Sequence, residues 1–172
     1  CDTHVHVIGE AKAYPMVADR QYTPGLADVT DLKRHLKRLG LTRAVIIQPS
    51  VYGTHNECLL DALSSMAGQA RGVAVLDTQT TTNALQTLDT QGVRGIRLNL
   101  AGISHEIPEW MRAERVWQTL HQLGWHLEVH TDQGALPKVL AQLPSDMPLV
   151  VDHMAKPSEA SASDATVQAL MH

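Results

Sequence analysis

Two histidines near the start of the chain have a spacing that suits metal binding or substrate binding. His4 and His6 alternate within an apolar run that we interpret as a strand, Thr3–Ile8. Successive side chains of a strand point to opposite faces, so both imidazoles face the same side. Two such rings can bind a divalent metal or hold the oxygen atoms of a substrate. The alternative is that they are polar strand residues whose hydrogen bonds are satisfied internally.

Two further histidines each end a predicted strand. His130 ends the segment His126–His130, and His153 ends the segment Val150–His153. One such histidine by itself would favour a satisfied polar residue, but four that converge at one end of a sheet favour a functional site. His126 lies at the start of its strand, away from that end, and we expect a structural role for it.

Arg97 lies between two apolar neighbours in the segment Arg94–Asn99. Arginine is rarely buried without a partner, so its guanidinium should face a carboxylate. One interpretation is an internal partner, with Asp2 and Glu128 as candidates. The other is the carboxylate of an anionic substrate, held by two parallel hydrogen bonds.

Tyr22 and Ser50 follow the first two predicted strands. Tyr22 ends a long polar segment of the kind that often forms a substrate loop, so its hydroxyl binds a ligand or its ring packs under the loop. Ser50 likewise either hydrogen-bonds a ligand or serves only the structure of its own loop. No Gly-x-Ser-x-Gly motif surrounds it, which argues against a nucleophilic serine. The histidines on predicted helices and loops receive no role: His35, His55, His105, His121 and His172.

Short runs rich in β-branched residues alternate along the chain with segments of helical periodicity. Several runs are almost continuously apolar, which is typical of parallel strands buried on both faces. The predicted strands are Thr3–Ile8, Arg43–Pro49, Arg71–Asp77, Gly95–Leu100, His126–Thr131 and Leu149–His153.

The first helical segment places Leu32, Leu36 and Leu39 on one face, behind Thr30 as a candidate N-cap. Similar patterns predict five further helices. They begin behind Asn56, near Ala84, near Val116, near Leu136 and near Asp164.

Regular alternation of strands and helices predicts a parallel sheet, either open or closed into a barrel. No glycine-rich phosphate motif follows the first strand, and polar residues follow almost every strand, as at the top of a (β/α)₈ barrel. We therefore predict a TIM barrel of the α/β class with six of its eight strands present, forming one incomplete domain over residues 1–172. We expect the chain to be a fragment of a protein of roughly 250 residues or more.

The composition excludes two classes of partner. A formal net charge of −4 argues against nucleic acid, and no apolar run approaches the roughly 20 residues that cross a bilayer. Two distant cysteines, Cys1 and Cys58, form no disulfide framework and favour a cytoplasmic protein. We expect a small-molecule ligand, and association into a homo-oligomer stays open.

Five segments carry motifs that are specific in combination: Asp2–His6, Tyr22–Pro24, Val45–Thr54, Gly92–Asn99 and Val151–Pro157. In this order, over the whole chain, they resemble the amidohydrolase superfamily. Within it, they are most similar to the branch of the 2-pyrone-4,6-dicarboxylate lactonases and related sugar lactonases.

The resemblance implies a hydrolase in which water attacks the ring-ester carbonyl of an anionic lactone, such as a pyrone carboxylate or a sugar-acid lactone. It implies that His4, His6 and His153 position or polarise the lactone. It assigns substrate binding to the residues that match Tyr22, Ser50 and Arg97. The water-activating aspartate of the family is expected on strand eight, beyond His172.

Two departures from the family pattern bear on the ligand and on metal. The lactonases have a second arginine shortly after the position of Arg97, whereas Leu100–Ile103 offers none, so we expect a less charged ligand. His130 lies where many superfamily members keep a metal ligand. His4, His6 and His130 with the later aspartate would form a zinc site.

We favour a site without a cofactor, in which His130 contacts the substrate. Zinc or another divalent metal is the alternative, and it would make the protein a decarboxylase or hydratase of the same superfamily. A third hypothesis is an inactive fragment or a binding module.

Overall fold

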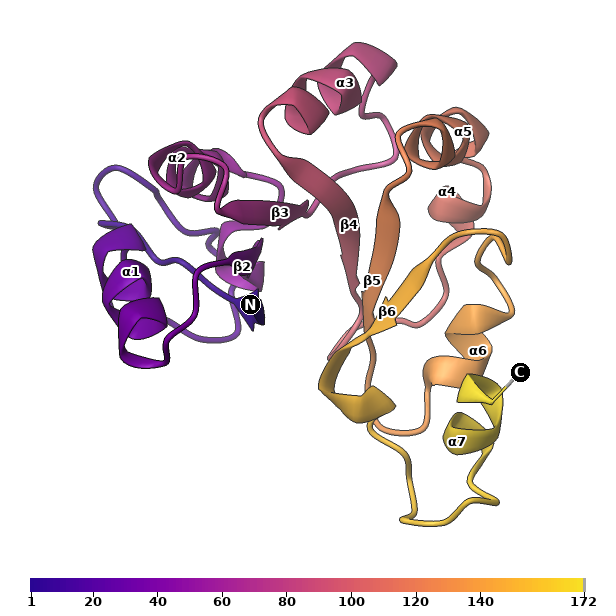
Figure 1. Ribbon diagram of the computed structural model, residues 1–172. Coiled ribbons are helices and arrows are strands. Elements are labelled where there is room, and N and C mark those ends of the chain that lie inside the picture. The colour runs from indigo at the N-terminus through magenta and orange to yellow at the C-terminus, as the bar shows by residue number, and fades with distance from the viewer. Residues whose placement is uncertain (172) are drawn as a thin grey trace.

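The computed structural model describes residues 1–171 and contains one curled sheet of six parallel strands in chain order (Figure 1). This confirms the predicted α/β fold: the sheet is a half-barrel. All six predicted strands are present with shifted bounds; five are shorter than predicted, and β4 is one residue longer. The strands are β1 (Asp2–Val5), β2 (Ala44–Ile47), β3 (Ala70–Ala74), β4 (Val93–Asn99), β5 (His126–His130) and β6 (Leu149–Val151).

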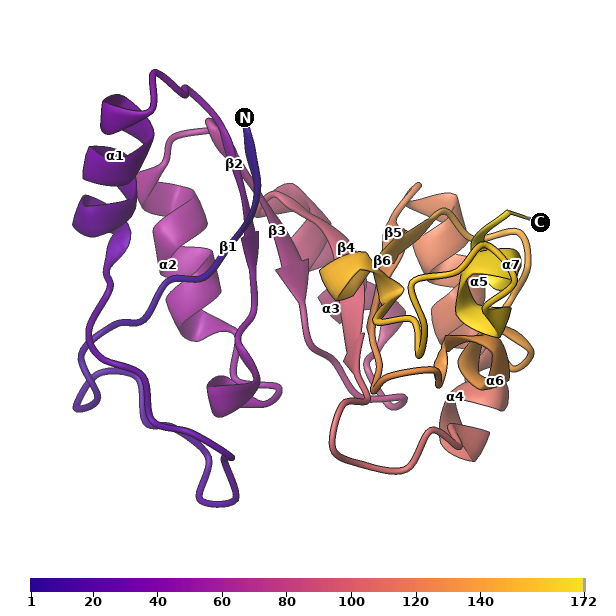
Figure 2. The same ribbon diagram turned by 90° about the horizontal axis from the view of Figure 1, so that it is seen from below.

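Helices follow the strands and cover the outer face of the curled sheet (Figure 1). Viewed from below, the carboxyl ends of the strands lead into loops on one side of the sheet (Figure 2). The helices are α1 (Val29–Arg38), α2 (Glu57–Ser65), α3 (Thr82–Thr90), α4 (Pro108–Met111), α5 (Glu114–Gln122), α6 (Leu136–Leu140) and α7 (Ala165–Leu170). There are also two short 3₁₀ helices. One, η1 (Ser50–Tyr52), follows β2 after a short loop, and the other, η2 (Asp152–Ala155), directly follows β6.

The start and end of α1 differ from the prediction. Asp28, not Thr30, caps the helix, because its extended backbone lets the carboxylate accept from the amides of Thr30 (2.8 Å) and Asp31 (3.0 Å). Leu32 and Leu36 are buried as expected. Leu39 is the C-cap residue and is 57% exposed, because the chain leaves the helical path there. The short helix α4 was not predicted.

The core lies between the sheet and the helices, and strand residues are buried on both faces. Ile46 and Ile47 on β2 are neighbours that point to opposite faces, yet their exposed fractions are 1% and 0%. This is the burial expected for a parallel sheet covered by helices on one face and filled by side chains on the other.

Gly95 sets how closely β4 and β5 approach. A Cβ added at Gly95 would lie 2.8 Å from the carbonyl oxygen of His126 and 2.7 Å from its ring. Glycine is therefore required for the register that pairs Arg97 with Glu128 and Asn99 with His130. That register carries two candidate site residues into place.

Within residues 1–171, no helix has the length and apolar character needed to cross a membrane. Both cysteines are free thiols, with Cys1 exposed and Cys58 buried.

Candidate active site

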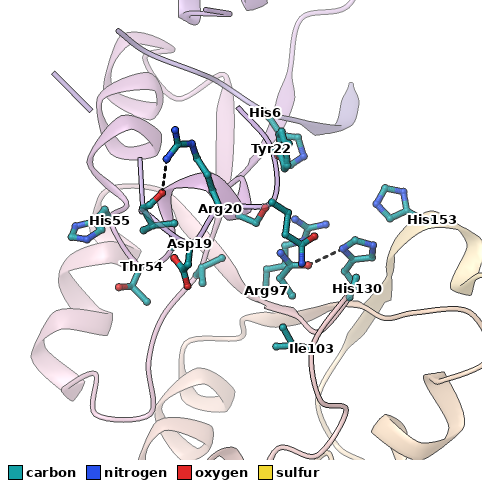
Figure 3. A pocket seen from close by; sticks show the side chains of 17 residues that line it. His6, Asp19, Arg20, Tyr22, Thr54, His55, Arg97, Ile103, His130 and His153 are labelled. Carbon is teal, nitrogen blue, oxygen red and sulfur yellow. Dashed lines mark hydrogen bonds between the residues drawn. The ribbon is translucent and has the colours of Figure 1, made fainter. Parts of the chain in front are cut away.

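A cavity of about 600 Å³ lies at the carboxyl ends of the strands (Figure 3). It contains six of the seven residues that the sequence singled out, and the seventh, His4, contacts the same cluster from β1. Those lining the cavity are His6, Tyr22, Ser50, Arg97, His130 and His153. His55, to which no role was given, also lines it, whereas His172 lies outside the described residues.

Arg97 contacts two buried carboxylates at the base of this cavity. Its Nε donates to Oδ2 of Asp152 at 3.0 Å, and its Nη2 donates to the same oxygen. Nε also lies 3.1 Å from Oε1 of Glu128, without the geometry of a hydrogen bond. Glu128 was one of the two internal partners considered, whereas Asp2 instead lies 3.3 Å from His35. Arg97 therefore has internal partners and also faces the cavity.

Asp152, a strand-end residue that received no role from the sequence, joins His4 to Arg97. Nδ1 of His4 lies 3.3 Å from Oδ1 of Asp152, and Nε2 of His4 is buried with no hydrogen-bond partner among the described residues. The hydrogen bond with Asp152 raises the pKa of His4, against burial, which lowers it. His4 is thus poised to carry a proton on Nε2 and to donate it to a ligand oxygen.

The two carboxylates of the cluster titrate differently. Burial is the largest influence on Asp152 and favours its neutral form, but His4 and Arg97 outweigh it and lower its pKa to about 2. Burial, followed by the charge of Asp152, raises the pKa of Glu128 to about 7. Near neutral pH, Asp152 is ionised and Glu128 is only partly ionised, so the charge of Arg97 is largely balanced.

His6 is oriented by the neighbouring strand. Its Nδ1 lies 2.8 Å from the carbonyl oxygen of Ile47, to which it donates as the Nδ1–H tautomer. Although the ring is open to the cavity, desolvation by surrounding atoms lowers the pKa of His6. The ring lies 5.2 Å from that of His4 and is nearly perpendicular to it. A neutral His6 presents Nε2 as an acceptor beside the donor Nε2 of His4.

His130 has partners on both ring nitrogens. Nδ1 lies 2.8 Å from Oδ1 of Asn99, and Nε2 lies 2.9 Å from Nζ of Lys156. Burial first, then the charges of Arg97 and Lys156, lower the pKa of His130 to about 4. The ring is therefore neutral, and it accepts a hydrogen bond from the ammonium group.

The turn after β6 presents His153 through an unusual backbone. His153, Met154, Ala155 and Lys156 have consecutive positive φ values of 52°, 56°, 61° and 45°. Each non-glycine residue in this left-handed region costs roughly 1–2 kcal/mol. The ring of His153 is exposed and lies 4.6 Å from that of His130. Strain of this kind concentrates at functional sites.

The first two loops complete the cavity. Tyr22 is 48% exposed, and its hydroxyl makes no hydrogen bond to any residue that the structure describes. Ser50 begins η1, and the fully buried Gln48 holds that loop by donating to the carbonyl oxygens of Gly53 (3.3 Å) and His55 (2.7 Å). Both residues line the cavity.

Two groups of side chains in residues 1–171 have metal-ligating atoms within 4.8 Å of one another. They are His130, Asp152 and His153, and His4, Glu128 and Asp152. The set considered from the sequence, His4 with His6 and His130, is not such a group in this part of the chain. Both groups depend on Asp152, whose Oδ2 already accepts from the guanidinium of Arg97.

A sequence model of the amidohydrolase family matches residues 1–172. The chain belongs to this family. Two characterised relatives are similar to it. One is a 2-pyrone-4,6-dicarboxylate hydrolase of Comamonas testosteroni, 31% identical over 98% of this chain and 56% of the relative. The other is a 4-sulfomuconolactone hydrolase of Rhizobium radiobacter, 28% identical over 90% of this chain and 52% of the relative. The chain thus spans about half the length of these relatives.

Solved structures show the same fold. A probable 2-pyrone-4,6-dicarboxylic acid hydrolase of Acinetobacter baumannii, with citric acid bound, matches with a TM-score of 0.81 at 30% identity, over 97% of this chain and 63% of that one. A putative 2-pyrone-4,6-dicarboxylic acid hydrolase of Pseudomonas putida matches with a TM-score of 0.83 at 31% identity, over 99% of this chain and 63% of that one. An amidohydrolase of Burkholderia multivorans with bound zinc matches with a TM-score of 0.60 at 20% identity, over 90% of this chain and 57% of that one. At this identity the match shows the fold alone.

Proposed function

We propose that the protein is a hydrolase that opens an anionic lactone by attack of water on the ring-ester carbonyl. The observation that carries this proposal is the meeting of His6, His153 and Arg97 at one cavity, with the ring of His4 beside those of His6 and His153. The names of the two characterised relatives support it, since both describe hydrolases of anionic lactones. The two free cysteines support a reducing compartment such as the cytoplasm.

The three histidines divide the work according to their protonation. His4, whose pKa is raised by the hydrogen bond with Asp152, donates from Nε2 to the carbonyl oxygen of the lactone and stabilises the negative charge that develops there. Neutral His6 accepts a hydrogen bond at Nε2 and thereby orients the water or the lactone ring. His153, whose ring centroid lies 6.1 Å from that of His4, contacts the lactone beside it.

The remaining predicted residues hold the substrate. The hydroxyl groups of Tyr22 and Ser50, on the first two loops, donate hydrogen bonds to the substrate. Arg97 on β4 and His130 on β5 form the adjoining wall of the cavity. In the reaction, the water oxygen bonds to the carbonyl carbon, the ring carbon–oxygen bond breaks, and the leaving oxygen takes a proton. The group that removes the proton from water is still expected beyond residue 172.

The arrangement of the donor atoms fits a divalent metal poorly, which supports a metal-free site. Any ion bound by Asp152 would lie beside the guanidinium of Arg97, and His130 already accepts from the ammonium of Lys156. We therefore propose that no metal is needed. Elemental analysis should find less than about one zinc per chain, and chelation should leave the rate unchanged. One tightly held zinc with activity lost on chelation would favour the decarboxylase or hydratase alternative.

The direct test is acid release at constant pH by the protein in its full natural length. 2-Pyrone-4,6-dicarboxylate, other pyrone carboxylates and aldonolactones are the substrates to compare. We expect release above background for at least one anionic lactone. Absence of release from every one of them would contradict the proposal.

A further inference from the structure

The cavity needs a positive charge to bind an anionic lactone, and Arg97 is largely neutralised. Its guanidinium contacts Asp152 and lies 3.1 Å from Glu128. Arg20, which also lines the cavity, donates to the carbonyl oxygen of Val17 (3.0 Å) and to Oγ1 of Thr23 (2.9 Å). These bonds direct the guanidinium into its own loop (Figure 3). Carboxylates therefore balance the charge of Arg97, whereas Arg20 keeps its charge but is held by its own loop.

Lys156 is a further cation, held beside the cavity-lining ring of His130. Its side chain is partly buried, and no carboxylate of residues 1–171 lies within 4.0 Å of its ammonium group. Its one side-chain hydrogen bond in that range goes to Nε2 of His130, a neutral ring. An ammonium group has three donors, so two remain available. A partly buried cation without an anion is the arrangement expected where a ligand supplies the anion.

The backbone fixes this ammonium beside the cavity. Lys156 has a left-handed conformation, its carbonyl oxygen accepts from Gly134 (3.0 Å), and the carbonyl oxygen of Pro157 accepts from Gln133 (3.2 Å). The turn is thereby tied to the loop after β5. His130 and His153 both line the cavity, so the ammonium lies at their end of it.

We propose that Lys156 is the anion-recognising residue of the site and that its ammonium, held against His130, binds a carboxylate group of the lactone. This inference rests on the proposed function and names the residue that selects anionic over neutral lactones. It also accounts for binding of an anionic ligand without a second arginine at Leu100–Ile103.

The test separates binding from chemistry in the protein of full natural length. Lys156→Met keeps the length of the side chain and removes its charge, Lys156→Arg keeps the charge, and Lys37→Met removes a charge from the exposed face of α1. Thermal unfolding shows that each variant is folded. Kinetics with 2-pyrone-4,6-dicarboxylate and with the neutral δ-valerolactone measure selectivity. Calorimetry with citrate measures anion binding without turnover.

For Lys156→Met we expect KM for the dicarboxylate to rise about tenfold or more, the size of effect typical of a lost charge-assisted hydrogen bond. We expect kcat to change little, the neutral lactone to be unaffected, and citrate affinity to fall in parallel. Lys156→Arg should recover most of the loss, and Lys37→Met should match the wild type.

Citrate affinity and KM that are unchanged in Lys156→Met would overturn the inference, as would a wild-type protein that binds no citrate. If lactones are opened but citrate binding ignores Lys156, this inference fails and the proposed function stands. If citrate binding depends on Lys156 but no lactone is opened, the proposed function fails and the anion site stands.

Discussion

At the residue scale, the protonation of a few buried side chains decides what the site can do. His4 and His6 are both histidines, and their ring centroids lie 5.2 Å apart, yet the pKa of His4 is raised and that of His6 is lowered. The hydrogen bond with Asp152 raises the pKa of His4, whereas burial lowers the pKa of His6 against its hydrogen bond with the carbonyl oxygen of Ile47. One ring is therefore a donor at Nε2 and the other an acceptor, which is what a carbonyl and an attacking water require.

Replacing His4 by Asn removes the donor assigned to the carbonyl oxygen. We expect kcat/KM for the lactone to fall about 100-fold to 1,000-fold, the usual cost of one preorganised oxyanion donor. The exposed His121 on α5 offers a matched control, and His121→Asn should retain full activity. Initial rates check both. Full activity in His4→Asn would remove His4 from the mechanism.

The same donor predicts a pH dependence. The protonated form of His4 is lost as pH rises through its raised pKa, so the rate should fall on the alkaline side. Asp152→Asn removes the largest cause of the raised pKa and should move that fall to lower pH. Rate profiles of both proteins against pH measure the shift. Coincident profiles would show that Asp152 does not control His4.

Glu128 should weaken the fold as it ionises. Its pKa is raised from 4.5 to about 7, so the folded state holds a proton that the unfolded state releases. Stability therefore falls as pH rises from about 4.5 to about 7. Urea denaturation at pH values of about 4.5 and about 7 measures this dependence of the free energy of unfolding on pH. Glu128→Gln should flatten it, whereas Glu159→Gln, on an exposed loop, should not. An unchanged dependence in Glu128→Gln would contradict the burial argument.

The sequence identified the residues that face the cavity and named Glu128 as a candidate partner of Arg97, but it did not reveal the ion pairs of Asp152. Strand-end position was enough to select His130 and Arg97, because parallel strands end on one side. Asp152 received no role beside His153, although its position as a charged residue directly after Leu149–Val151 was the available signal. Its partners come from β1 and β4, and no local pattern reveals such pairing.

At the scale of elements, strands were predictable and the turn η2 was not. An apolar run locates β2, since a parallel strand is buried on both faces. The left-handed path from His153 to Lys156 contains no glycine, so it lacks the usual sequence signal for positive φ. Packing against the loop after β5 holds it in place instead.

Gly95 provides a test of the register between β4 and β5. Gly95→Ala would place a Cβ against the backbone of His126, and we expect a loss of about 1–3 kcal/mol in the free energy of unfolding. Gly25→Ala is the control, because a Cβ there meets no atom within 4 Å. Urea denaturation compares the two. Equal stability of Gly95→Ala and wild type would show that the strands can separate without cost.

At the scale of the whole molecule, the described sheet has two edges. β1 pairs with β2 alone and β6 pairs with β5 alone within residues 1–171. Leu149 and Val150 on β6 are 39% and 44% exposed. An exposed apolar strand edge favours pairing with another chain.

A polypeptide of residues 1–172 alone should therefore self-associate at micromolar concentration. Val150→Lys on β6 should reduce this association because a charge disfavours edge pairing. Leu26→Lys, at an exposed position in the first loop, should leave it unchanged. Light scattering after size exclusion gives the mass. A wild-type polypeptide that stays monomeric would contradict this expectation.

The most direct test of the central claim follows the oxygen of water in the protein of full natural length. Turnover of 2-pyrone-4,6-dicarboxylate in heavy-oxygen water, followed by mass spectrometry, identifies the bond that water makes. Attack on the ring-ester carbonyl predicts one heavy oxygen in the new carboxylate, none in the released enol oxygen, and no loss of carbon dioxide. Heavy oxygen at the other end of the broken bond, or a product lighter by carbon dioxide, would contradict a lactone hydrolase.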